Sequence, residues 1–136
     1  MQYLKGNSGQ GIFLDSDCDI KLYGWCDADW AACPLTRWSL TGWIIFLGRS
    51  PISWKTKKQQ MMSQSFAEAE YRSMANTTCE HKWVNGILSS LGIIHPMPMQ
   101  LYCDSQVTQN HVFHECTKHI EVDCHFVRNE IIYGHL

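Results

Sequence analysis

One long stretch, residues 65–91, most constrains how this chain folds. It contains a single glycine, Gly86, and no proline. Two sets of side chains recur in it at helical spacing: Ala67, Tyr71, Met74 and Thr78, then Val84, Ile87, Leu88 and Leu91. Ser65 and Glu68 have the spacing of a capping box, and Gly92 stands where a helix stops. The sequence therefore predicts one long helix over residues 65–91.

Runs of apolar and β-branched residues around this stretch predict strands. Three runs precede it, over residues 20–28, 41–48 and 49–57. The second run is nearly all apolar and is expected in the centre of a sheet, with a hairpin leading to the third. Residues 100–104 predict a fourth strand, and residues 117–132 a last helix. The expected fold is α/β: a three-strand antiparallel meander, a crossover helix and a strand parallel to the first.

Three acidic residues stand at informative places in this order. Asp27 ends the first strand, Asp104 ends the fourth, and Glu70 lies in the first turns of the long helix. If the fourth strand lies beside the first, Asp27 and Asp104 are neighbours at one edge of the sheet. Carboxylates held close together repel one another, and a hard divalent cation removes that conflict. Taken singly, the three acids are also explained by a turn, a solvated helix position and a helix cap.

Composition places the chain among globular proteins, with 136 residues, 45% hydrophobic and 18% charged. The apolar runs are too short to span a bilayer, and the N-terminal stretch has no apolar signal core. The expected location is therefore the cytoplasm or the nucleus. A net charge of −2 excludes a general basic field for nucleic acid. Lys55, Lys57 and Lys58 form a local basic cluster that suits contacts to phosphates, or is simply solvated.

The seven cysteines include no Cys-x-x-Cys pair, so we expect reduced thiols. A stretch with four possible metal ligands offers a zinc site as an alternative; its ligands are His111, His114, Cys116 and His119. The spacing of these four residues matches no recognised zinc motif. The competing interpretation is a polar loop that leads into a helix.

Several long motifs carry a family resemblance. The segments YGWCDADWAACPLTRWSLTGWIIFLGRSPISWKTKKQ, AEAEYRSMA, LYCDSQ and FHECTKHIEVDCHFVR occur in this order. Together they resemble the ribonuclease H domain of Ty1/copia-type LTR retrotransposon Pol polyproteins. Residues 1–19 are similar to the linker between reverse transcriptase and ribonuclease H, and residues 20–136 to the domain itself. The resemblance implies a ribonuclease H-like mixed sheet with flanking helices.

The resemblance also implies an activity, namely metal-dependent hydrolysis of the RNA strand of RNA–DNA hybrids. Asp27, Glu70 and Asp104 match the family's catalytic, metal-binding acids, which hold two Mg²⁺ or Mn²⁺ ions. Lys118 and His119 lie in a family motif, where a substrate contact and a structural role at a helix start are both open. In the parent polyprotein the partners are reverse transcriptase and integrase, within a virus-like particle.

The chain departs from the family pattern at its C-terminal end. The fourth carboxylate, the fifth strand and the final helix of the family are expected to be missing, so residues 20–136 form an incomplete domain. The segment after Asp104 is about one helical turn shorter than the pattern. A non-catalytic remnant that binds nucleic acid or another partner, with Lys55, Lys57 and Lys58 contacting phosphates, is therefore the alternative function.

Overall fold

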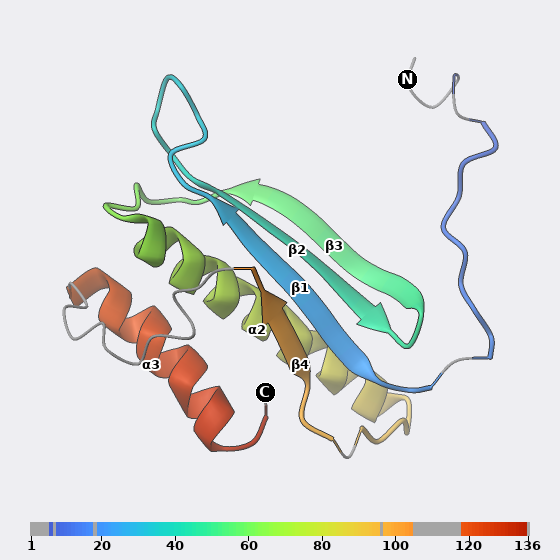
Figure 1. Ribbon diagram of the computed structural model, residues 1–136. Coiled ribbons are helices and arrows are strands. Elements are labelled where there is room, and N and C mark those ends of the chain that lie inside the picture. The colour runs from blue at the N-terminus through green and yellow to red at the C-terminus, as the bar shows by residue number, and fades with distance from the viewer. Residues whose placement is uncertain (1–5, 7, 18, 96, 105–117, 136) are drawn as a thin grey trace.

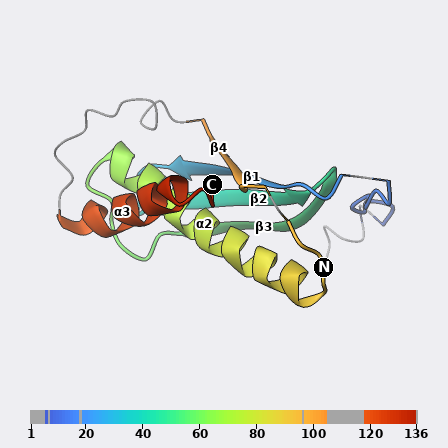
Figure 2. The same ribbon diagram turned by 90° about the horizontal axis from the view of Figure 1, so that it is seen from below.

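The described part of the chain forms a mixed four-stranded sheet with two helices against one face (Figures 1 and 2). The computed structural model describes residues 6, 8–17, 19–95, 97–104 and 118–135. The elements are β1 (Leu22–Asp29), β2 (Leu40–Leu47), β3 (Ser50–Lys58), α2 (Phe66–Ser90), β4 (Gln100–Cys103) and α3 (Lys118–Ile132). The strand order is β3-β2-β1-β4, antiparallel except for the parallel pair β1–β4. This arrangement confirms the predicted meander with a parallel fourth strand.

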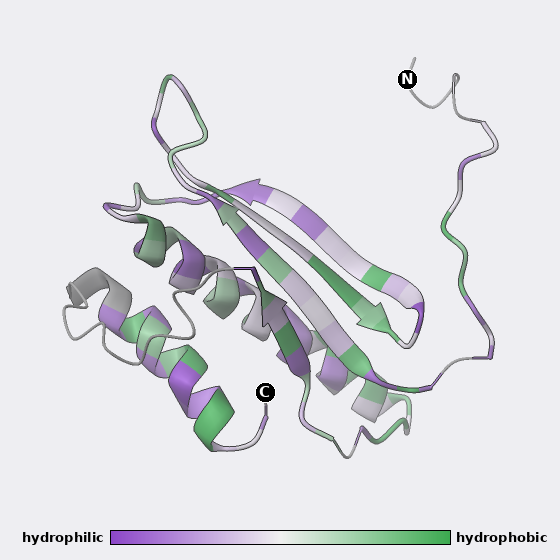
Figure 3. Ribbon diagram, in the orientation of Figure 1, coloured by the Kyte–Doolittle hydropathy of each residue, from purple (hydrophilic) through white to green (hydrophobic). Residues whose placement is uncertain are grey.

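The two faces of β1 differ because successive side chains of a strand point to opposite sides. Leu22, Gly24, Cys26 and Ala28 are buried on the helix side, whereas Trp25 and Asp27 are exposed. Figure 3 shows this alternation toward the C-terminal end of β1, where green and purple bands follow one another. The first strand therefore packs the core with one set of side chains and presents the other set on the open face.

Helix α2 begins and ends with the predicted caps. The Ser65 hydroxyl accepts a hydrogen bond from the Glu68 backbone N–H at 3.2 Å. At the other end, Gly92 has a φ of 78°, and the Ile93 N–H donates to the Leu88 carbonyl at 2.9 Å. A residue without a side chain suits this left-handed conformation, which closes the last turn and turns the chain toward β4.

The predicted helix is confirmed, and only part of its second apolar stripe is buried. Val84 and Leu88 are buried, but Ile87 and Leu91 are exposed. The buried stripe repeats every three to four residues through His81, Val84 and Leu88, and this spacing leaves Ile87 to one side. Leu91 is the C-cap residue, beyond the last turn that the sheet covers.

The core has two clusters of buried side chains that join the sheet to the helices. One cluster contains Leu22, Ile45, Val84, Leu88 and Met99, and the other contains Cys26, Met74, Ala75 and Val127. The second cluster brings α3 onto the same side of the sheet as α2. It also lies directly behind the ends of β1 and β4, where the acidic residues stand.

Candidate active site

The ends of β1 and β4 place two acidic residues side by side. The parallel register pairs Cys26 with Cys103, so that Asp27 and Asp104 follow on neighbouring strands. Both aspartates are exposed, and the Asp27 Oδ1 accepts a hydrogen bond from the Ala28 N–H at 2.8 Å. The predicted juxtaposition of the two aspartates is confirmed, but the prediction that Asp27 ends the first strand is wrong, because pairing with β2 continues β1 to Asp29.

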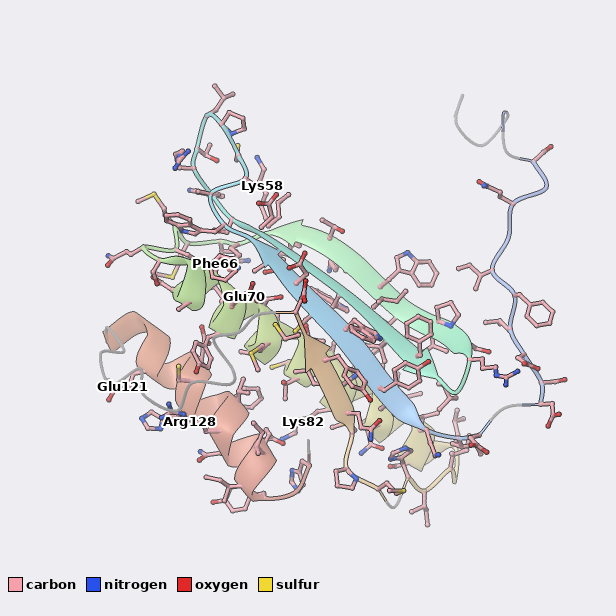
Figure 4. All side chains as sticks on the ribbon, viewed as in Figure 1. Lys58, Phe66, Glu70, Lys82, Glu121 and Arg128 are labelled. Atoms are coloured by element: carbon pink, nitrogen blue, oxygen red, sulfur yellow. The ribbon has the colours of Figure 1, made fainter. Side chains whose placement is uncertain are left out.

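Glu70 approaches the same place from helix α2 and is buried (Figure 4). The Cys103 thiol donates a hydrogen bond to its Oε2 at 3.2 Å. Burial raises the pKa of Glu70 to about 8, helped by the Cys103 thiol and by the negative charges of Asp27 and Asp104. Asp27 and Asp104 are therefore close enough to Glu70 for their charges to act on its carboxyl group.

These carboxylates suit a hard cation chemically, but they do not form a ready coordination site. Within the described ranges, no group of three or more His, Cys, Asp or Glu residues is arranged to hold a metal ion. Asp27 lies on the exposed face of β1, whereas Glu70 is buried and engaged by Cys103. A divalent cation at this place would need Glu70 to give up its proton and its thiol contact.

Glu68, the other acid at the start of α2, has a structural role. Its Oε2 accepts from the Gln64 N–H at 2.7 Å, and its Oε1 accepts from Arg72 at 2.7 Å. Arg72 also contacts the Asp123 carboxylate of α3 at 3.8 Å and donates to the Ser63 hydroxyl at 2.9 Å. The prediction that Glu68 caps the helix is confirmed, which leaves Glu70 as the helix acid of the site.

A shallow groove of about 630 Å³ runs beside the two aspartates on the open face of the sheet. Its lining includes Asp27, Asp104, Lys55, Trp25 and Trp54. The sequence prediction did not include the two tryptophans. Trp25 was recognisable, because it stands two residues before Asp27 in the same strand and so faces the same side.

The predicted lysine cluster lies on the second half of β3, where all three lysines are exposed. Lys55, Lys57 and Lys58 line a second groove of about 390 Å³ together with Arg72. The Lys55 Nζ lies 5.8 Å from the centre of the Trp43 ring. Of these three lysines, Lys55 also lines the groove beside the aspartates, and Lys57 and Lys58 do not.

Cys33, in the connection between β1 and β2, contacts the lysine cluster. Its Sγ lies 3.4 Å from the Lys58 Nζ, which donates to it. Hydrogen bonds from the Thr36 side chain and backbone, then from the Leu35 backbone, lower the pKa of Cys33 to about 6. A large share of this thiol is therefore ionised near neutral pH.

The remaining predicted residues lie outside the described part of the chain or at its border. His111, His114 and Cys116 of the alternative zinc site lie outside the described residues. Lys118 and His119 open helix α3, and their side chains also lie outside the described part. The described helices are not long and apolar enough to cross a membrane.

Comparison with known proteins gives clear relatives, although no family model matches the chain. The Pol polyprotein of transposon RE1 from Arabidopsis thaliana is 42% identical over 140 residues, an alignment that covers all of this chain and 10% of the polyprotein. The Pol polyprotein of transposon TNT 1-94 from Nicotiana tabacum is 35% identical over 136 residues, covering 96% of this chain and 10% of the polyprotein. The chain thus spans about a tenth of the length of these relatives.

A solved structure with a similar fold is LC11 ribonuclease H1 in complex with an RNA/DNA hybrid. It aligns with a TM-score of 0.60 at 9% identity, covering 85% of this chain and 79% of that one. At this identity the likeness concerns the fold alone. Sequence and fold together show that the chain is a homologue of part of the copia-type retrotransposon Pol polyproteins and has the ribonuclease H fold.

Proposed function

We propose that this chain is a ribonuclease H-type nuclease segment that hydrolyses the RNA strand of RNA–DNA hybrids. The observation that carries the proposal is the convergence of Asp27, Glu70 and Asp104 at one end of the sheet. The two aspartates help to raise the pKa of Glu70, which is the electrostatic signature of carboxylates gathered for a cation. The relatives support the proposal, because they are retrotransposon polyproteins that carry this stretch.

The three acids would hold Mg²⁺ or Mn²⁺, two ions in the family pattern. When bound, the cations supply positive charge that activates water and stabilises the oxygens around the reacting phosphorus. Glu70 contributes once it loses its proton and its Oε2 turns from the Cys103 thiol to a cation. Asp27 and Asp104 contribute from the exposed side, where a phosphodiester has access.

The groove beside the aspartates suits a nucleic acid. Lys55 offers a charge to a backbone phosphate, while Trp25 and Trp54 offer exposed rings for contact with bases or sugars. Lys57 and Lys58 extend the basic surface along β3. Reverse transcriptase and integrase segments of a Pol polyprotein are the proposed partners in the longer chain.

The test is cleavage of a hybrid labelled on its RNA strand, with Mg²⁺ or Mn²⁺ and with a chelator. We expect Asp27→Asn, Asp104→Asn and Glu70→Gln each to lower the rate by about a hundredfold or more, because each removes a carboxylate that would hold a cation in place. Asp29→Asn is the matched control, an exposed acid of the same strand that does not line the groove, and should keep the wild-type rate.

A second readout separates metal binding from turnover. A bound cation stabilises the folded state, so Mg²⁺ or Mn²⁺ should raise the Tm of the wild type and not that of Asp27→Asn. If the folded wild type neither cuts the hybrid nor gains stability from either ion, the nuclease proposal is wrong.

Binding without catalysis is a second candidate function, favoured by the lack of a ready coordination group among the described side chains. In that case the hybrid binds equally well with a chelator present. Lys55→Ala would then weaken binding, whereas Asp27→Asn would leave it unchanged or tighten it by removing a repulsive charge.

A further inference from the structure

We propose that Cys26 and Cys103 form a redox-modification site, a vicinal dithiol that a small-molecule disulfide oxidises to a β1–β4 cross-link. The two residues are direct partners in the parallel ladder, one residue before Asp27 and Asp104. This inference goes beyond the proposed nuclease and does not depend on it.

The geometry of the pair suits a disulfide. Both side chains point to the helix side, where Cys26 is buried and Cys103 is half-buried. The neighbouring Cys103 side chain, and then burial, raise the pKa of the Cys26 thiol, as expected for two sulfur groups held side by side. Neighbouring strands are about 4.8 Å apart, within the Cα separations of about 4.4 to 6.8 Å that disulfides span.

The two sulfurs have different access, which orders the reaction. The Cys103 thiolate attacks the oxidant R–S–S–R, forms a mixed disulfide and releases one R–S⁻. The Cys26 thiolate then attacks the Cys103 sulfur, so that the protein disulfide forms and the second R–S⁻ leaves. Two protein thiols are oxidised, one small disulfide is reduced to two thiols, and the two thiol protons pass to the released thiolates.

The cross-link affects Asp27, Glu70 and Asp104 in two ways. It removes the S–H that Cys103 donates to the Glu70 Oε2. It also joins β4, a strand of four residues, covalently to β1 immediately before the two aspartates. Oxidation therefore fixes the spacing of these strand ends and frees one oxygen of Glu70.

The experiment is treatment of the folded chain with oxidised glutathione, followed by peptide mapping under non-reducing conditions. We expect a cross-linked peptide that contains Cys26 and Cys103, lighter than its two parts by two hydrogens. Dithiothreitol should reverse it. Cys26→Ser and Cys103→Ser should abolish this peptide, while Cys33→Ser, the matched control in the same tryptic segment as Cys26, should retain it.

A trivalent arsenical, phenylarsine oxide, provides a probe that needs no oxidation, since it joins two adjacent thiols and releases water. One arsenical per chain should bind between Cys26 and Cys103 in the wild type, and both single serine variants should lose it. The proposal is overturned if oxidation leaves these two cysteines unlinked, or joins either one to another cysteine, in a chain whose circular dichroism is native. Neither readout uses RNA cleavage, so failure of the nuclease leaves this test intact.

Discussion

The two faces of the sheet differ in how far their side chains are buried. On the helix side, β1 and β2 contribute buried side chains such as Leu22, Cys26 and Ile45, which helix α2 covers. On the open face, Trp25, Trp54 and Tyr102 are 50%, 56% and 41% exposed. Some of these rings stack on one another, as Trp25 does on Tyr102 with ring centres 4.7 Å apart. Packing against the helices determines which side chains the first face carries. The second face can carry charged groups and aromatic rings that contact a ligand.

The sharpest test of this contrast uses two adjacent isoleucines of β2. Ile45 is fully buried on the helix side, and Ile44 is half-buried on the open face. We expect Ile45→Ala to lower the free energy of unfolding by about 3 to 4 kcal/mol, because it leaves a cavity in the core. Ile44→Ala should cost about 1 kcal/mol. Urea denaturation of the two variants measures the difference, and equal losses would contradict the contrast between the faces.

His81 offers a pH test of the covered face. Neither of its ring nitrogens has a hydrogen-bond partner of good geometry in the described structure. Burial lowers the pKa of His81 to about 4, opposed by the Tyr23 carbonyl and the Glu80 carboxylate. The unfolded chain therefore binds this proton more readily. The contribution of neutral His81 to stability is present above about pH 6.5 and is lost as the pH falls to about 4, up to about 3 kcal/mol.

Chemical denaturation from pH 7 to pH 4 measures this effect. His81→Met is the comparison variant, and the wild type should lose more stability than the variant over this range. Parallel curves for the two proteins would show that His81 does not titrate in the way its burial requires.

Gly24 tests how closely β1 and α2 approach each other. A Cβ at this position would lie 2.5 Å from the His81 Nε2, well inside van der Waals contact. We expect Gly24→Ala to destabilise the fold by about 2 kcal/mol, through overpacking of a site that has little room. Gly42→Ala in the neighbouring strand is the control, because nothing lies within 4 Å of its added Cβ. Thermal unfolding that ranks the two variants alike would contradict this account.

The open face should show the smallest effect on stability and a clear effect on binding. Trp54→Ala removes a ring that is more exposed than buried, so the free energy of unfolding should change by less than about 1 kcal/mol. Affinity for a hybrid should fall about tenfold, because an aromatic ring that stacks on a base contributes about 1 to 3 kcal/mol. Fluorescence anisotropy with a labelled hybrid measures it, and unchanged affinity would show that the ligand does not reach β3.

Local patterns predicted much of the fold, since strand alternation, the Ser65–Glu68 cap and the Gly92 stop are short-range signals. The proximity of Asp27 to Asp104 was also predictable, once the fourth strand was placed beside the first. Contacts between segments far apart in the sequence could not be predicted from these local patterns. The burial of His81 against Gly24 and the donation from Cys103 to Glu70 depend on how α2 lies across the strands. A single sequence does not encode that placement in any local pattern.

The guanidinium of Arg72 has a consequence for how the molecule opens. It donates to the Met61 carbonyl and the Ser63 hydroxyl, pairs with Glu68 and reaches Asp123. One side chain thus holds the loop before α2, the first turns of α2 and helix α3. These segments cannot separate independently without breaking that shared set of contacts, so their backbone amides are expected to exchange hydrogen with solvent as one cooperative unit.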